Sequence, residues 1–320
     1  MAVYLSSLKL QSLLNALPGG IAQGLIWGIM ALGVYLTFRM LGFSDLSVDG
    51  SIATGGAVSV VLILKGINPE VSLLACFLVG AAAGVVTALL NTRLGIPAIL
   101  AGILTQISLY SINLYVLGKA NQAINVNAVK LLFSSNIKFL WKTIGICIVV
   151  ALLIISLLYW YLGTEQGCGI RATGINANMA KAQGINTDHM TIITLGLSNG
   201  LVALAGGILA QYQGYADVNM GRGAIVIGLA AVIIGEVLGD ALLGKHLNFY
   251  GRLIFVVIGG IIYYCVYVFV LWLKFPANLM KLLTAVVVAV FLAIPYLRAQ
   301  SKSSFAHLKR VNRKAAKEKK

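Results

Sequence analysis

Long, uninterrupted runs of apolar residues dominate the chain, and short polar stretches separate them. A helix that crosses a bilayer needs about 20 apolar residues, and runs of this length recur along the sequence. The runs do not alternate between apolar and polar positions, which favours helices over the strands of a membrane barrel. We therefore predict an all-α fold, a polytopic transmembrane helix bundle of about nine spans. The predicted spans are residues 18–38, 46–64, 71–91, 97–117, 140–162, 190–211, 223–241, 252–273 and 280–297.

Both ends of the chain differ from this pattern. Residues 1–17 mix leucine and valine with polar residues, which predicts an amphipathic segment at the membrane interface. Residues 298–320 contain nine lysines and arginines and one acid, Glu318. A basic tail directly after an apolar run suits the anionic cytoplasmic leaflet, although a merely solvated chain end is compatible with the same pattern. We thus divide the chain into an interfacial segment (1–17), a transmembrane domain (18–297) and a basic cytoplasmic tail (298–320).

Composition agrees with membrane insertion. Of the 320 residues, 59% are hydrophobic and 10% are charged, whereas soluble domains carry about 25% charged residues. Lipid must therefore solvate much of the surface. The 35 glycines suit close packing of helix backbones in lipid. The net charge of +15 comes with no fold that would present a base-reading surface, so we expect no nucleic-acid partner.

The tail also predicts an orientation. With nine spans and a cytoplasmic C-terminus, the N-terminus lies outside. Arg39, Arg93 and the polar loop 163–189 then lie in the cytoplasm, in agreement with the positive-inside rule once the tail is counted.

The loop 163–189 is the longest polar interruption among the later spans. Ala172 to Gln183 is predicted to form one short helix, with Thr173 or Asn176 as its cap and Gly184 as its stop. Such a helix is too polar to enter lipid, so it must contact water or another protein.

Enzyme signatures are poorly represented. The three histidines, His189, His246 and His307, fall in predicted loops or the tail without a metal-type partner nearby, so we predict no metal site and no catalytic residue. Residues 239–246 resemble a phosphate-binding loop, but His246 stands where Ser or Thr must hold magnesium and no strand precedes it. We expect no nucleotide or other cofactor in this chain.

Polar residues gather at the start of the second predicted span. Asp45 and Asp49 are two of only nine acids in the chain, and small residues surround them. One interpretation is a helix cap with tight packing. The other is a discontinuous helix that lines a solute path, because acids near a span often mark function. The candidate path residues are Ser44, Asp45, Ser47, Asp49, Ser51, Thr54 and, on the fourth span, Gln106.

Three stretches together resemble one family. The first is Gly24–Gly56, which ends in FSDLSVDGSIATGG. The second runs from Arg171-Ala172-Thr173-Gly174-Ile175-Asn176 through Ala180 to Gly184-Ile185-Asn186-Thr187, and the third combines residues 203–207 with Gly221-Arg222-Gly223. In this order they resemble the permease subunits of bacterial ABC importers for branched-chain amino acids, with sugar permeases as more distant relatives.

The resemblance implies a permease domain at 18–297 and a mechanism. An extracytoplasmic substrate-binding protein would deliver an amino acid, aromatic or branched-chain. Two permease subunits, identical or different, would form the path in the bacterial cytoplasmic membrane, and a separate ATPase subunit would bind ATP and magnesium. The loop 163–189 would hold the short cytoplasmic coupling helix. Its implied coupling residues are Arg171, Ala172, Thr173, Gly174, Asn176, Ala180 and Gly184.

Two other function classes remain open from the sequence. Acids near predicted spans would also suit a secondary transporter driven by protons or sodium. A membrane enzyme would need a pair of reactive polar groups facing one cavity, and the sequence offers no such pair.

Overall fold

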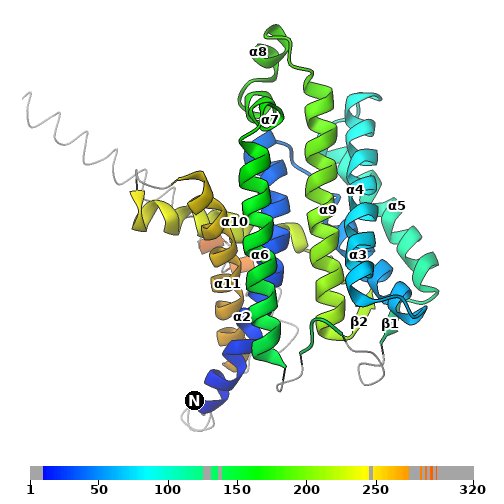
Figure 1. Ribbon diagram of the computed structural model, residues 1–320, viewed down its shortest axis with the longest axis vertical. Coiled ribbons are helices and arrows are strands. Elements are labelled where there is room, and N and C mark those ends of the chain that lie inside the picture. Colours follow the sequence, from blue (N-terminus) through cyan, green and yellow to red (C-terminus); the bar gives the residue numbers. More distant parts are fainter. Residues whose placement is uncertain are drawn as a thin grey trace, which may run out of the picture.

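The computed structural model describes residues 10–124, 131–135, 139–244 and 248–273, and also residues 282, 285, 286, 289, 290 and 293. Nearly all of these residues are helical (Figure 1). The helices are α2 (Leu10–Tyr35), the π-helix η1 (Leu36–Leu41), α3 (Val48–Leu64), α4 (Pro69–Thr92), α5 (Ala98–Leu117), α6 (Leu140–Leu162), α7 (Glu165–Ile175), α8 (Ala177–Ala182), α9 (Thr187–Gln213), α10 (Ala224–Leu242) and α11 (Phe249–Trp272). Two short antiparallel strands, β1 (Asn121–Ala123) and β2 (Tyr215–Asp217), accompany them.

The predicted all-α membrane fold is confirmed. Among the described residues, seven helices are long and apolar enough to cross a bilayer. α3 coincides with the second predicted span but has only 17 residues. The ninth predicted span, 280–297, lies mostly outside the described residues, as do residues 1–9 and the basic tail.

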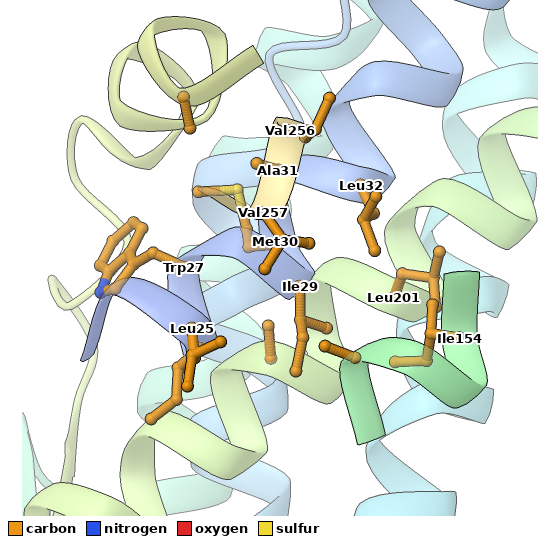
Figure 2. Close-up of a cluster of buried hydrophobic side chains, with 14 of the residues drawn as sticks. Leu25, Trp27, Ile29, Met30, Ala31, Leu32, Ile154, Leu201, Val256 and Val257 are labelled. Atoms are coloured by element: carbon orange, nitrogen blue, oxygen red, sulfur yellow. The ribbon is translucent and has the colours of Figure 1, made fainter. Parts of the chain in front are cut away.

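Two helices form the centre of the bundle. In the apolar stretch of each helix, 83% of the residues of α2 and 78% of those of α9 are buried. In α5, at the edge of the bundle, the share is 28%. Figure 2 shows α2 side chains such as Ile29 packed among Ile154 of α6, Leu201 of α9 and Val257 of α11. Glycines allow the close approach: a Cβ atom added to Gly206 of α9 would lie 2.0 Å from the carbonyl oxygen of Ile52 in α3.

The bundle has two distinct ends. α7 and α8 cap one end, where α2 and η1 stop at Gly42 in the left-handed conformation. α7 sits directly on η1, since a Cβ atom on Gly174 would lie 1.9 Å from the Met40 carbonyl oxygen. The start of α2 and the β1–β2 pair lie at the opposite end (Figure 1).

Two expected boundaries need correction. α2 begins at Leu10 and runs through Pro18 without a break, so the helix of the first predicted span begins eight residues earlier than expected. Neighbouring helices can compensate for the backbone bond that proline loses.

The single helix predicted for Ala172–Gln183 is also wrong. α7 ends at Ile175 and α8 begins at Ala177, because Asn176 is extended (φ −157°, ψ 97°) and its side-chain oxygen accepts a 3.0 Å bond from the Met179 amide. Asparagine competes with the helix for its own backbone in this way. Gly184, with φ +81°, ends α8 as predicted.

Candidate functional site

α3 begins inside the bundle rather than at its end. Residues 42–47 lead from η1 back between the helices, and Ser47 and Ser51 meet Asn199 near the middle of α9. A Cβ atom on Gly50 would lie 3.2 Å from the Cα atom of Gln106, near the middle of α5. α3 is a single short helix with a buried N-terminus, in agreement with the cap-and-packing interpretation and not with a discontinuous helix.

A closed hydrogen-bond network fixes this N-terminus. The Asp45 carboxylate accepts bonds from the Ser47 amide at 2.9 Å, the Ser47 hydroxyl at 2.5 Å and the Asn199 side-chain amide at 2.7 Å. The Asn199 side-chain oxygen in turn accepts from Ser51 at 2.5 Å. All four side chains are at most 2% exposed. Because each polar group has a partner, this network is suited to holding α3 against α9.

Asp49, in the first turn of α3, contacts the start of a second helix. Its two carboxylate oxygens each accept a 2.9 Å bond, one from the Gly223 amide and one from the Ile225 amide. These amides begin α10, whose own N-cap residue, Gly223, has no side chain to cap it. A carboxylate is favourable at a helix N-terminus. Asp49 therefore ties the buried starts of α3 and α10 together.

A cavity of about 280 Å³ opens beside Asp49, between α3, α5 and the segment that precedes α10. Its wall includes a carboxylate, a guanidinium, amides and an aromatic ring. The lining residues are Asp49, Gly50, Ala53, Gln106, Ile107, Tyr110, Asn113, Val218, Asn219 and Arg222. Asn113 is 1% exposed, and its side-chain nitrogen has no hydrogen-bond partner in the described structure. A buried amide without a partner costs free energy. A polar group in the cavity that accepted a bond from this nitrogen would remove that cost.

The structure separates the seven candidate path residues. Asp49 and Gln106 line the cavity. Asp45, Ser47 and Ser51 belong to the buried network instead, and Ser44 is exposed outside it. Thr54 is buried in α3, where its hydroxyl donates to the Gly50 carbonyl at 2.9 Å.

Other polar residues also line the cavity, beyond the seven candidates. Tyr110 and Asn113 lie on the same face of α5 as Gln106, at helical spacings of four and seven residues. Asn113 is a polar residue within the predicted fourth span and was a further candidate, whereas only this spacing could have indicated Tyr110. Arg222 and Asn219 come from an irregular segment, for which periodicity gives no signal.

The loop 163–189 forms a base and a tip. α7 is the base, and Arg171 on it is half-buried with its guanidinium 3.2 Å from the Cys168 sulfur. Thr173 is buried and donates to the Gly169 carbonyl, so it does not cap a helix. The tip, which runs from the last residue of α7 through α8, exposes two apolar residues, Ile175 (87% exposed) and Met179 (63%).

The other predicted coupling residues serve the shape of this loop. Gly174 contacts η1, Asn176 caps α8, Ala180 is buried and Gly184 turns the chain toward α9. Ala172 lies within α7.

Comparison with known proteins identifies the family. Residues 17–294 match the family described as "Branched-chain amino acid transport system / permease component". The chain belongs to this family. The permease is 37% identical to the tyrosine transport system permease protein of Clostridioides difficile, over 89% of this chain and 93% of the relative. It is 28% identical to the ribose import permease protein of Escherichia coli K12, over 78% and 75%.

A solved structure, PsaBC from Streptococcus pneumoniae in complex with Fab, matches 84% of this chain and 95% of that chain at 16% identity, with a TM-score of 0.35.

Family membership confirms the predicted role. The protein is the membrane-spanning permease component of an ABC importer, a multi-pass transport protein rather than an enzyme. Permeases of this family generally work with ATPase and binding-protein partners. An ion-driven secondary transporter, the alternative left open by the sequence, does not fit this membership.

Proposed function

We propose that the permease imports an aromatic amino acid, tyrosine or a close analogue, and that the cavity beside Asp49 lies on its path. The cavity chemistry is the observation that carries this proposal. Arg222 suits a carboxylate, Asp49 suits an ammonium group, and Tyr110 offers a ring for aromatic contact. Asp49 keeps lone-pair capacity for a solute because the amides at the start of α10 occupy only part of the roughly four bonds that a carboxylate can accept.

Size is consistent with a small solute. At about 280 Å³, the cavity is at the lower limit of the roughly 300–1,000 Å³ typical of ligand pockets. The tyrosine permease of Clostridioides difficile, which is 37% identical, supports the same substrate class.

The open side of the cavity supports the pairing of two permease subunits. Its α5 wall is open: Ile107 is 62% exposed and Tyr110 is 44% exposed. Exposing polar groups such as Gln106 and Arg222 to lipid would cost free energy. A second permease subunit, identical or homologous, would cover this wall and complete the path.

The coupling proposal rests on the α7–α8 loop. The α8 tip would dock on a separate ATPase subunit, which binds ATP and magnesium, and a binding protein would deliver the solute at the β1–β2 end. α7 contacts η1 through Gly174, so a displacement of the tip would move the central helix α2. Alternating access requires such a two-state element.

The orientation follows from this assignment. With α7 and α8 in the bacterial cytoplasm, the start of α2 lies outside, because α2 ends beside α7. α11 begins at the α7 end and ends beside the start of α2, where Val268 would contact a Cβ atom on Gly20. The C-terminal tail would reach the cytoplasm through the ninth predicted span.

Uptake by reconstituted vesicles tests the substrate. The permease, its ATPase and its binding protein are placed in liposomes, and uptake of labelled tyrosine is measured with and without internal ATP. We expect ATP-dependent uptake that excess phenylalanine inhibits and excess ribose does not. Uptake of ribose but not of tyrosine would reject the amino-acid assignment while leaving the importer role intact.

A further inference from the structure

Three arginines converge at the α7 end of the bundle, far from the cavity beside Asp49. Arg39 of η1, Arg171 of α7 and Arg252 of α11 line one cavity of about 280 Å³. The elements that carry them are distant in sequence, so only the fold brings these charges together. Repulsion between like charges must be offset, which makes the cluster a candidate anion site.

Only part of this charge is neutralised by the protein. The Arg39 Nε atom lies 2.8 Å from the Glu236 carboxylate. Within the described residues, no carboxylate lies within ion-pair distance of Arg171 or Arg252. Two guanidinium groups, both half-buried, therefore keep donors that match a phosphate in geometry and charge.

The surroundings of the arginines are apolar and face outward. The remaining lining residues are Tyr35, Met40, Phe249 and, at the exposed rim, Ile175. A second cavity of about 530 Å³ shares Arg171 and Phe249 and continues along the end of α6, where Trp160 is 70% exposed. These residues lie where three apolar spans end or begin, at α2–η1, α6 and α11. Exposed tryptophan at a span end is typical of the membrane interface.

We propose that this cluster binds the phosphodiester head group of an anionic phospholipid of the cytoplasmic leaflet. The head group would lie between Arg171 and Arg252, and an acyl chain would follow the Trp160 surface of α6. Basic clefts between spans at this leaflet suit such lipids. The bound lipid would link α7 to η1 and α11, and so would stabilise the base of the coupling loop.

Native mass spectrometry of the purified permease tests the proposal. The protein is mixed with phosphatidylglycerol or with the net-neutral phosphatidylethanolamine, and the retained lipid per chain is measured. At about fivefold in affinity for each arginine, Arg171→Gln and Arg252→Gln should each weaken phosphatidylglycerol binding by that factor. The double variant should bind phosphatidylglycerol more weakly than either single variant, by up to roughly 25-fold for independent contacts.

Arg93→Gln is the matched control. Arg93 ends α4 at the same end of the bundle, is exposed and lines neither cavity, so its loss should leave phosphatidylglycerol binding unchanged. Size-exclusion profiles confirm that each variant is folded. Inorganic phosphate at the same concentration should not displace the lipid, because it lacks the acyl chain.

Four results would overturn the proposal. The first is phosphatidylglycerol binding by the double variant that is as strong as that of the parent protein. The second is equal binding of phosphatidylethanolamine and phosphatidylglycerol, and the third is displacement of the lipid by inorganic phosphate. The fourth is loss of ATPase co-purification in Arg252→Gln with unchanged lipid binding, which would assign the cluster to the partner protein. None of these measurements depends on which solute is transported.

Discussion

Asn199 is the residue on which the buried network depends, because it contacts Asp45, Ser47 and Ser51 at once. It also donates to the Leu195 carbonyl of its own helix. A single amide thus donates to a buried carboxylate and accepts from the Ser51 hydroxyl at the start of α3.

Asn199→Ala should destabilise the permease by about 3 kcal/mol, because the buried Asp45 carboxylate loses a hydrogen-bond donor. The measurement is unfolding in mixed detergent–SDS micelles. Ser108→Ala is the control: the Ser108 hydroxyl is exposed and bonds only the Leu104 carbonyl, so the expected change is within about 0.5 kcal/mol. Equal stability of both variants would contradict the network's role.

Substitution of Asp49 tests whether this residue only caps α10 or also binds the solute. Asp49→Asn keeps one acceptor oxygen for the α10 amides but removes the charge, so stability should fall by only about 1 kcal/mol. If the carboxylate also binds a solute ammonium group, uptake should fall about tenfold or more, since a charged hydrogen bond is worth roughly 1.5–3 kcal/mol. Full uptake by a correctly folded Asp49→Asn protein would leave only the capping role.

At the scale of elements, the base and the tip of the α7–α8 loop have different roles. The base packs on η1, whereas the tip presents Ile175 and Met179 to solvent. Exposed apolar side chains on a polar loop mark an interaction surface.

Ile175→Asp and Met179→Asp should each abolish co-purification of the ATPase and ATP-driven uptake, because a charge would replace an apolar contact at the interface. Detergent extraction and thermal stability should stay unchanged, since neither side chain is packed. Leu94→Asp is the matched control, because Leu94 is 69% exposed at the same end of the bundle. Undiminished ATPase binding in both tip variants would place the coupling contact elsewhere.

At the scale of the whole molecule, orientation is the property that connects the cavity to the coupling loop. The native cysteines offer a direct measurement of it. Cys168 on α7 is exposed, whereas Cys76 and Cys147 are buried and Cys265 is half-buried within a span.

A membrane-impermeant maleimide should therefore leave the permease of intact cells unlabelled and label it once the cells are opened. Cys168→Ser should abolish the signal. Ala120→Cys in that background, at the exposed opposite end of the bundle, should be labelled from outside. Labelling of Cys168 in intact cells would place α7 and α8 in the exterior and remove the basis of the coupling proposal.

The apolar pattern alone determined the spans. Eight predicted ranges coincide with helices, because twenty consecutive apolar residues in lipid have few alternatives to a helix. The stop at Gly184 was also predictable, since a glycine with positive φ ends helices for local steric reasons.

Only the tertiary structure decided which polar residues meet. The sequence grouped Asp45 and Asp49 because they are four residues apart, but one carboxylate faces Asn199 of α9 and the other faces the start of α10. Likewise, nothing local brings Arg39, Arg171 and Arg252 to one cavity. Hydrophobicity along the chain specifies how much of it enters the membrane, whereas contacts between distant helices depend on packing in three dimensions, which local pattern does not encode.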